Sequence, residues 1–317
     1  MATLEEIEKA RKELPSDIVY TPLVRAEAIS DQVGAKVQLK TENLQVTGSY
    51  KSRAAYTILN RLSDGQKKRG AAISSSGNFA AAFAYMGQLL GIPTTIVMME
   101  KTSPYKVDRT RKFGTEVVIC ENRNQARWEA LEKLEAEQGI TAINTWEYSD
   151  VVIGHGSIGA EIMEQAPDVE VVLVPISSGG LIAGIATAVK TLKPAVQVVG
   201  VQPEGSQAMY QSFQKKELCE VPEPKTVCDA LVAPRPGGLP FELVKKYVDD
   251  VVLVSDEQAI DAIRILISTT KLVVEPGGAV GVAAMLNGVV DVKGKKVVAL
   301  LSGGNIEPAQ LGGYLAT

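Results

Sequence analysis

The sequence predicts an α/β protein with two domains, each holding a mostly parallel sheet flanked by helices. Short apolar runs rich in valine and isoleucine alternate with longer helical patterns along most of the 317 residues, which is the rhythm of strand–helix–strand units. Valine, leucine and isoleucine dominate the runs at 169–176 and 296–302. Such runs are typical of parallel strands that helices cover on both faces.

The individual elements follow from the same periodicities. A helix at 122–138 is strongly charged on one face, which predicts a position at the surface. Residues 219–247 contain five of the 15 prolines and little periodicity, so we expect an irregular crossing there. Further helices are expected at 80–90, 179–192 and 256–269, and strands at 36–40, 71–75, 94–99, 115–120, 169–176, 196–202, 250–254 and 296–302.

The order of these elements indicates that one domain is inserted into the other. The segment from 55 to 147 carries three of the expected strands together with its own helices. We therefore predict a small domain over residues 55–147 and a large domain over residues 1–54 and 148–317.

Composition and charge exclude several classes of function. The chain has 33 basic and 37 acidic residues, a formal net charge of −4, and so lacks the basic footprint of a nucleic-acid or membrane-surface protein. No apolar run reaches the ~18 residues of a membrane span, and the N-terminus lacks the pattern of a secretion signal. The three cysteines have neither metal-ligand nor disulfide spacing, which indicates a reducing, cytoplasmic setting and a small-molecule partner or a second subunit.

The single histidine, His155, narrows the chemistry further. One histidine excludes Ser-His-Asp triads and multi-histidine metal sites. Its segment, GHGSIG at 154–159, formally matches the G-x-G-x-x-G dinucleotide fingerprint. That fingerprint needs an acidic residue about 20 residues later, where this chain has an ISSGGL turn without a carboxylate. We therefore expect His155 at a helix start or beside a cofactor.

Four polar, glycine-rich turns follow apolar, strand-like runs, namely VTGSYK (46–51), SSSGNF (74–79), ISSGGL (176–181) and LSGGN (301–305). Ligands of open α/β sheets bind beyond the carboxyl ends of the strands, where such turns meet. The ISSGGL turn opens a helix and suits a single phosphate, although a tight strand–helix turn without a ligand has the same residues. The SSSGNF turn offers hydroxyl and amide donors to a carboxylate or phenolate.

One charge in these turns is poorly placed for local helix stability. Lys51 directly precedes a helical pattern, and the helix macrodipole disfavours a positive charge at that end. A solvated surface lysine is the ordinary interpretation, but the position also suits a lysine selected for chemistry.

Together these motifs resemble the pyridoxal-phosphate enzymes of the tryptophan-synthase-β fold type (PLP fold type II), most closely the serine/threonine dehydratase and serine racemase family. Residues 40–55, KTENLQVTGSYKSRAA, are similar to the family's K-x-E-x-x-Q-x-T-G-S-F-K-x-R-G-A, with Tyr50 for phenylalanine and Ala54 for glycine. Residues 18–30 and 273–284 resemble its entry segment and its E-P-x-x-A-x-G-x-A-A helix. The resemblance spans essentially the whole chain.

The resemblance implies pyridoxal 5'-phosphate as cofactor and a role for each turn. Lys51 is implied to hold the cofactor as a Schiff base and to act as catalytic base for the Cα proton. The other implied cofactor-binding residues are Asn78 at the phenolic oxygen, Ser177, Ser178, Gly179, Gly180 and Leu181 at the phosphate, and Ser302 at the pyridine nitrogen. The implied substrate-binding residues are Ser75, Ser76, Gly77, Asn78, Phe79 and Trp146.

These residue types favour elimination. A neutral hydroxyl such as that of Ser302 does not keep the pyridine nitrogen protonated as a carboxylate would, which weakens the electron sink and suppresses transamination. We therefore predict an ammonia-lyase (dehydratase) that converts a β-hydroxy-α-amino acid to a 2-oxo acid and ammonia. Phe79 replaces the histidine of the family's S-G-N-H turn, so the expected substrate is serine, threonine or a bulkier analogue such as phenylserine.

Several alternatives stay open at this stage. Ser76 occupies the place of the racemases' serine, so with Lys51 it would make the protein an amino-acid racemase. A β-replacement synthase and a non-enzymatic cofactor or amino-acid sensor are further alternatives. Gln202 and Ala208 stand where the racemases' divalent-cation site would need carboxylates, so we expect no metal there. The resemblance also implies a homodimer.

Overall fold

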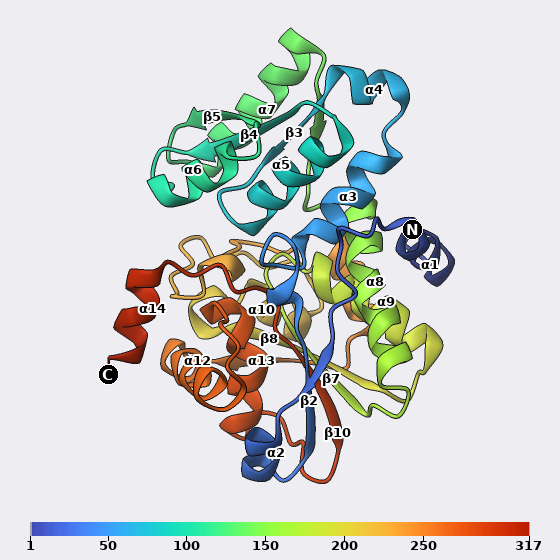
Figure 1. Cartoon of the computed structure of the whole chain (residues 1–317), viewed down its shortest axis with the longest axis vertical. Coiled ribbons are helices and arrows are strands. Elements are labelled where there is room, and N and C mark those ends of the chain that lie inside the picture. Colours follow the sequence, from blue (N-terminus) through green and yellow to red (C-terminus); the bar gives the residue numbers. More distant parts are fainter. Residues whose placement is uncertain (1, 317) are drawn as a thin grey trace.

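The computed structural model describes residues 2–316 and contains two separate sheets, one above the other in Figure 1. Both sheets are mostly parallel and both are covered by helices. The predicted fold class is therefore confirmed.

The larger sheet has the strand order β1-β2-β10-β7-β8-β9, and β1 alone among these runs antiparallel to its neighbour. Alternate side chains of β7 point to opposite faces, Val172 and Val174 to one and Val171 and Leu173 to the other. Both faces of this strand are buried, which explains its continuous apolar run. The strands are β1 (Leu23–Arg25), β2 (Lys36–Lys40), β7 (Val171–Pro175), β8 (Gln197–Pro203), β9 (Asp250–Val254) and β10 (Lys296–Leu300).

Helices cover this sheet in two layers. The layer that packs on Val172 and Val174 consists of α1 (Leu4–Glu13), α8 (Ser149–Gln165), α9 (Gly180–Leu192), α10 (Ala208–Lys215) and α11 (Gly238–Tyr247). The opposite layer consists of α2 (Glu27–Val33), α12 (Asp256–Thr270) and α13 (Pro276–Leu286), with α14 (Pro308–Leu315) against α12.

The smaller sheet is entirely parallel, with the strand order β5-β4-β3-β6. Its strands are β3 (Ala71–Ser74), β4 (Thr94–Met99), β5 (Glu116–Cys120) and β6 (Thr141–Ile143). One face packs on α3 (Lys51–Arg61), α5 (Asn78–Leu90) and α6 (Pro104–Arg111), and the other packs on α7 (Asn124–Gln138). The short α4 (Asp64–Arg69) connects α3 to β3, and 3₁₀ turns occur at Glu42–Leu44, Glu204–Ser206 and Asp229–Leu231.

The sequence analysis did not predict β1 and β6, which have three residues each, because runs that short carry little periodicity.

The irregular crossing expected over 219–247 is wrong in its last part, where α11 begins at Gly238. The Glu147 carboxylate accepts hydrogen bonds from the backbone N–H groups of Gly238 (2.8 Å) and Leu239 (3.1 Å) and so caps this helix. Glu147 lies 91 residues before Gly238, so local sequence does not reveal the cap.

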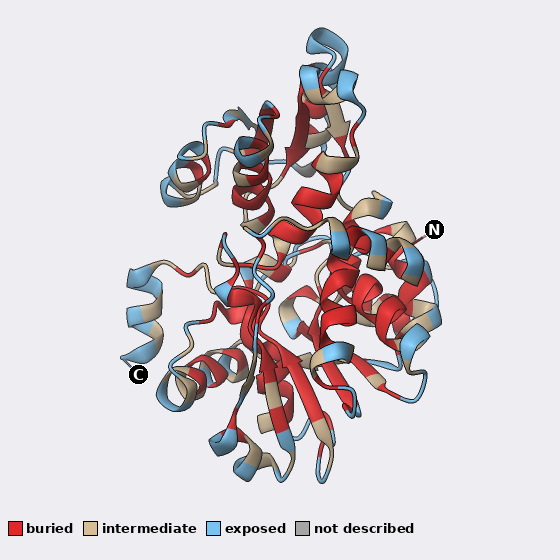
Figure 2. Cartoon of the chain, turned by 45° about the vertical axis from the view of Figure 1, so that its right-hand side comes forward, coloured by how far each residue is buried: buried red, intermediate tan, exposed pale blue. Residues whose placement is uncertain are grey.

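The helix α3 links the two sheets. It begins at Lys51 and packs against both α5 and α8, so the domain boundary expected between residues 54 and 55 falls inside a continuous helix. Figure 2 shows buried residues concentrated in the strands and in the helices at this junction. Lys51 therefore stands on a rigid element between the sheets.

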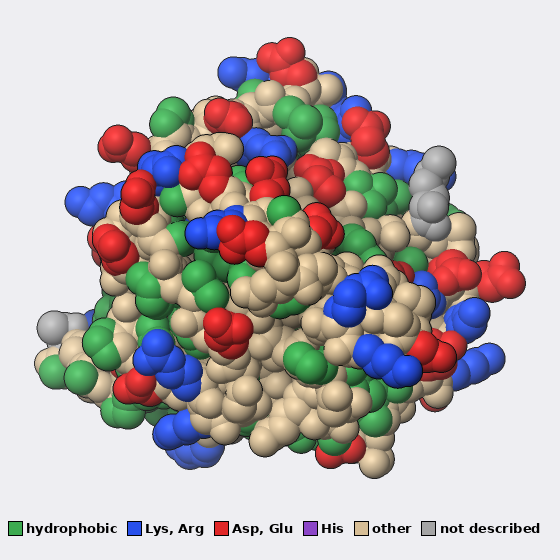
Figure 3. Space-filling model, turned by 90° about the horizontal axis from the view of Figure 1, so that it is seen from above, with side chains coloured by type: hydrophobic (Ala, Val, Ile, Leu, Met, Phe, Trp, Pro, Cys, Tyr) green, Lys and Arg blue, Asp and Glu red, His purple; other side chains and the backbone are tan. Residues whose placement is uncertain are grey.

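The surface agrees with the composition. Over residues 2–316, no helix combines the length and apolar character needed to cross a bilayer. Figure 3 shows acidic and basic side chains interspersed on the face seen from above, with no patch of a single sign. This face has no extended basic field for a nucleic acid.

Candidate active site

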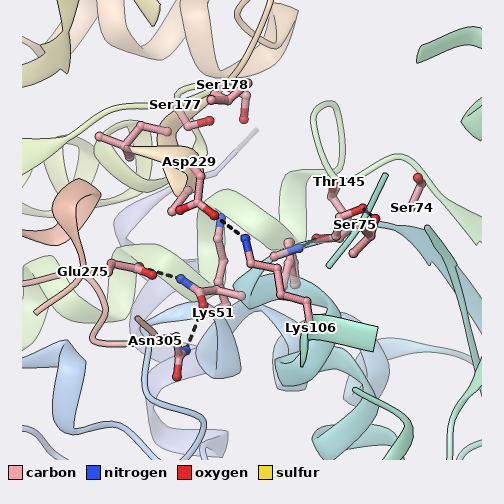
Figure 4. Close-up of a pocket in the computed structure, with 18 of the residues that line it drawn as sticks. Lys51, Ser74, Ser75, Lys106, Thr145, Ser177, Ser178, Asp229, Glu275 and Asn305 are labelled. Carbon is pink, nitrogen blue, oxygen red and sulfur yellow. Dashed lines mark hydrogen bonds and ion pairs between the residues drawn. The ribbon is translucent and has the colours of Figure 1, made fainter. Parts of the chain in front are cut away.

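A cavity of about 510 Å³ lies between the two sheets, and the turns that follow β3, β6, β7 and β10 line it. Figure 4 shows these turns converging on Lys51. The structure brings together every residue that the sequence assigned to the site, namely Lys51, Ser75, Ser76, Gly77, Asn78, Phe79, Trp146, Ser177, Ser178, Gly179, Gly180, Leu181 and Ser302.

The turn before Lys51 is fastened to the turn after β10. Ser49 pairs with Gly303 in an isolated antiparallel bridge, and the Tyr50 N–H donates to the Ser302 carbonyl oxygen at 3.1 Å. Gly48 has a φ of 71°, a conformation that glycine adopts without strain. These contacts place Lys51 and Ser302 in one cavity although they lie far apart in the sequence.

Lys51 is largely buried, and its amine lies between two aromatic rings. The Nζ atom is 4.5 Å from the Tyr50 ring centroid and 5.1 Å from the Phe79 ring centroid. Burial lowers the pKa of Lys51 to about 8, even though nearby Glu275 favours the charged form. An amine in this range is a usable nucleophile and base near neutral pH.

The Asn78 amide is held in one orientation by two neighbours, Glu275 and Asn305, which Figure 4 labels in the cavity. Its Nδ2 atom donates to Glu275 Oε1 at 2.6 Å, and its Oδ1 atom accepts from Asn305 Nδ2 at 2.8 Å. Asn305 in turn donates to the Thr47 carbonyl oxygen at 2.9 Å. The second Nδ2 hydrogen of Asn78 is therefore available to a ligand.

Glu275 is 3% exposed, and burial, reinforced by the negative Asp229, raises its pKa to about 8. The folded-state pKa thus exceeds the unfolded value of about 4.3. The folded protein binds the extra proton, so stability falls as the pH rises between these two values.

We expect Glu275→Gln to remove this pH dependence, because glutamine does not ionise and still offers an acceptor to Asn78. The stability advantage of the variant over the wild type should be small at pH 5 and grow to about 2–4 kcal/mol at pH 8. Urea unfolding of both cofactor-free proteins across this range measures the difference. Parallel stability curves would show that Glu275 is already ionised at pH 5.

The serines of the SSSGN turn differ in their surroundings. Ser74 Oγ accepts from Arg127 Nε at 2.6 Å, so this hydroxyl is engaged with α7. Ser76 Oγ accepts from Thr102 Oγ1 at 2.8 Å, which leaves the proton of Ser76 available. Ser75 Oγ accepts only a long, 3.3 Å hydrogen bond from the Gly77 N–H. Ser75 and Ser76 therefore retain donors for a carboxylate.

The glycine loop after β7 is shaped for close approach. Gly179 has a φ of 105°, and a Cβ atom there would lie 2.5 Å from Met209 Cε. The Ser178 carbonyl oxygen accepts from the Gly237 N–H at 2.9 Å, which fixes the loop so that Gly180 opens α9. The free N–H groups of the first turn of α9 form an anion site.

Several residues that the sequence did not assign also line the cavity, among them Arg127, Glu275 and Asn305. Arg127 extends from α7, the helix expected at the surface, and donates to both the hydroxyl and the carbonyl oxygen of Ser74. Burial lowers its pKa, and its guanidinium contacts the SSSGN turn at Ser74. The sequence does contain one indication that Glu275 has a special role, because it is the single carboxylate in an otherwise apolar stretch.

Gln202, at the position where we expected no metal, forms a hydrogen bond within the protein. Its Oε1 atom accepts from the Tyr210 N–H at 2.8 Å. Among residues 2–316, no group of three or more histidine, cysteine, aspartate or glutamate side chains is arranged to hold a metal ion.

A reactive lysine beside an anion-binding glycine loop, on this two-sheet fold, defines an α/β enzyme that holds an anionic cofactor next to an amine. The family model for "Pyridoxal-phosphate dependent enzyme" matches residues 14–303. The chain belongs to this family of pyridoxal-phosphate-dependent enzymes.

Named relatives cover nearly the whole chain. The L-threonine ammonia-lyase of Thermotoga maritima is 42% identical over 307 residues, which cover 97% of this chain and 76% of that protein. The L-threonine dehydratase catabolic TdcB of Staphylococcus aureus strain N315 is 39% identical over 320 residues, which cover 99% of this chain and 92% of that protein. Maize serine racemase superposes with a TM-score of 0.95 at 30% identity, with 99% of this chain and 97% of that chain covered.

The residues present fit the cofactor. Both ring nitrogens of the buried His155 and the hydroxyl of the buried Ser49 lack hydrogen-bond partners in the described part of the chain, as expected where a polar ligand completes the site. Lys51 supplies an amine, residues 177–181 an anion cradle, and Ser302 a neutral hydroxyl.

Proposed function

We propose that the protein is an ammonia-lyase (hydroxy amino acid dehydratase) that removes water from a β-hydroxy-α-amino acid and produces a 2-oxo acid and ammonia. The observation that carries the proposal is Lys51, whose pKa is lowered to about 8 by burial, in one cavity with Ser302 and the SSSGN turn. The names of the relatives from Thermotoga maritima and Staphylococcus aureus support the same reaction.

Each residue group has a distinct task in this proposal. When bound, pyridoxal 5'-phosphate supplies the electron sink for the electron pair left at Cα. The neutral amine of Lys51 takes the Cα proton, and its placement at the first turn of α3 keeps it within the cavity. Ser75, Ser76 and the Arg127 guanidinium bind the substrate carboxylate, since they surround one side of the cavity.

The remaining residues orient the cofactor. Residues 177–181 hold the phosphate at the start of α9, and the Asn78 amide, fixed by Glu275 and Asn305, donates to the phenolic oxygen. Ser302 presents a neutral hydroxyl to the pyridine nitrogen, which favours loss of the β-hydroxyl over transamination. The departing hydroxyl leaves as water, and the enamine released hydrolyses to the 2-oxo acid and ammonia.

The substrate side chain faces an apolar wall in this proposal. Phe79 is 6% exposed and its ring adjoins Lys51, while Trp146 lines the cavity and packs edge-on against Trp128 at 6.2 Å. A screen of serine, threonine, hydroxyaspartate and phenylserine should yield equal amounts of 2-oxo acid and ammonia from at least one of them. Failure of all four would remove the lyase proposal.

Racemisation is the second candidate, because the Ser76 hydroxyl faces the same cavity as Lys51 with its proton available. The similarity of this chain to maize serine racemase gives this candidate added support. Incubation with a single enantiomer separates the reactions: the mirror-image amino acid without 2-oxo acid indicates a racemase, and we expect 2-oxo acid to dominate. Ser76→Ala should abolish racemisation and leave most elimination.

Three further features belong to the proposal. Residues 55–147 form a small domain that closes over the substrate against residues 1–54 and 148–317, which is supported by the Lys106–Asp229 ion pair and the Ser103–Glu307 hydrogen bond between them. The protein forms a homodimer, a proposal supported by the exposed apolar side chains of Val19, Tyr20, Leu44 and Val46. It is cytoplasmic, consistent with three unpaired cysteines.

A further inference from the structure

The GHGSIG segment is a helix-packing motif in this fold. It lies in the middle of α8, and its glycines permit close contacts with neighbouring helices. A Cβ atom on Gly154 would lie 2.7 Å from the Cα atom of Ala54 in α3, and one on Gly184 of α9 would lie 2.6 Å from the backbone nitrogen of Gly156. Because α8 is wedged between α3 and α9, its rotation is fixed and residue 155 faces the cavity.

His155 is fully buried, yet its polar atoms are unsatisfied. Its ring packs at 4.7 Å from the Tyr50 ring and 6.3 Å from the Phe79 ring. Neither Nδ1 nor Nε2 has a hydrogen-bond partner among the described residues. Burial and the nearby positive Lys51 hold the pKa of His155 well below its usual value, although the backbone of Gly180 favours the protonated ring, so the imidazole is neutral, with one donor and one acceptor.

The nearest ligand-binding element is the glycine loop. A Cβ atom built on Gly180 would lie 3.8 Å from His155 Nδ1, and Gly180 is the first residue of α9. A buried N–H without a partner costs free energy unless a ligand accepts from it. Nδ1 therefore lies close to the first turn of α9, where free backbone N–H groups favour an anion.

We propose that His155 binds the cofactor phosphate, with its neutral Nδ1–H as a hydrogen-bond donor beside the backbone N–H groups of the glycine loop. This contact adds a side-chain donor from α8 to a cradle otherwise made by residues 177–181. The proposal rests on the family's cofactor and does not depend on the lyase reaction.

The test compares two cofactor forms and two matched variants. His155→Phe keeps an aromatic ring against Tyr50 but has no donor, and His155→Asn keeps an N–H donor at the position of Nδ1 without the ring. Affinity of each cofactor-free protein for pyridoxal 5'-phosphate and for pyridoxal, which lacks the phosphate, is measured by absorbance titration. We expect His155→Phe to weaken binding of the phosphorylated form by about 10-fold or more, to change pyridoxal binding less than about twofold, and His155→Asn to recover most of the loss.

Other results would overturn the proposal. Equal weakening of both ligands in His155→Phe would make His155 a packing residue, and unchanged affinity for the phosphorylated form would exclude the contact. Circular dichroism and thermal unfolding of the cofactor-free proteins check the fold. If His155→Phe does not fold, His155→Leu, which also has no donor, should show the same phosphate-selective loss. None of these measurements uses a substrate.

Discussion

Lys51→Ala should lose turnover by about 10⁴-fold or more, because one side chain supplies both the covalent anchor and the base for the Cα proton. Burial keeps the pKa of this amine at about 8, and no aqueous amine reaches the cavity at comparable effective concentration. Steady-state 2-oxo acid formation measures the loss. Partial rescue by a small primary amine such as ethylamine is expected, since it enters the space vacated by the side chain.

Borohydride labelling tests the anchor without a substrate. Treatment of the cofactor-loaded wild type should place the label on the peptide containing Lys51, and the label should be absent from Lys51→Ala. Lys106, a second cavity lysine that is paired with Asp229, provides the matched control, because Lys106→Ala should retain the label. A label found on Lys101 or Lys106 would mean that the anchor is assigned to the wrong lysine.

The rate of covalent capture of the cofactor should depend on pH through the same group. Only the neutral amine is a nucleophile, and with a pKa of about 8 Lys51 becomes neutral as the pH rises through that value. Capture by the cofactor-free protein is therefore expected to accelerate up to about pH 8 and then level off. A rate that still rises at pH 10 would indicate a lysine with an ordinary pKa.

The sequence was informative where structure and chemistry are local. The strands at 36–40, 94–99 and 250–254 agree residue for residue with β2, β4 and β9, because each has a short local pattern of a strand, alternating in KVQLK and apolar in the other two. Lys51 and Ser302 were found for the same reason, since each lies in a short glycine-containing turn directly beyond an expected element. The carboxyl ends of parallel strands lie at the same edge of a sheet, so the turns that follow these strands are expected to meet there.

The remaining site residues depend on contacts that no local pattern records. Glu275 and Asn78 are 197 residues apart, and Arg127 and Ser74 are 53 apart. Arg127 lies on a helix whose charged face suggested a surface position, and that helix is indeed mostly exposed. The inward direction of one guanidinium is set by the packing of α7 on the small sheet rather than by its own sequence.

A buried network of ion pairs near Lys51 also joins residues that are far apart in the sequence. Arg53, two residues after Lys51 in α3, has its guanidinium fully buried between the carboxylates of Glu42 and Glu161. It contacts Glu42 through Nε and Nη2, both at 2.9 Å, and Glu161 through Nη1 at 2.6 Å. Lys40 Nζ completes the network at 2.6 Å from Glu161, so the network joins α3, α8 and the segment preceding Lys51.

Arg53→Leu is expected to destabilise the protein by about 3–5 kcal/mol, because it leaves two buried carboxylates with only Lys40 between them. The loss should also loosen the first turn of α3 and weaken cofactor affinity. Arg53→Lys should be intermediate, since an ammonium cannot pair in bidentate fashion with both acids. The matched control is Arg123→Leu, which removes an exposed arginine that also pairs with two glutamates and should leave the unfolding midpoint unchanged.

The effect of Arg53→Leu should shrink in acid. Burial alone would raise the pKa of Glu42, but Arg53, Lys40 and the Thr21 hydroxyl together outweigh burial and the pKa is lowered. A depressed pKa contributes stability above the unfolded value of about 4.3, and that contribution disappears as the pH falls through the folded-state value. Urea unfolding of wild type and variant from pH 7 to pH 3 should therefore show midpoints that converge below about pH 4. A constant gap would mean that the arginine stabilises α3 through its packed alkyl chain, with its charge contributing nothing.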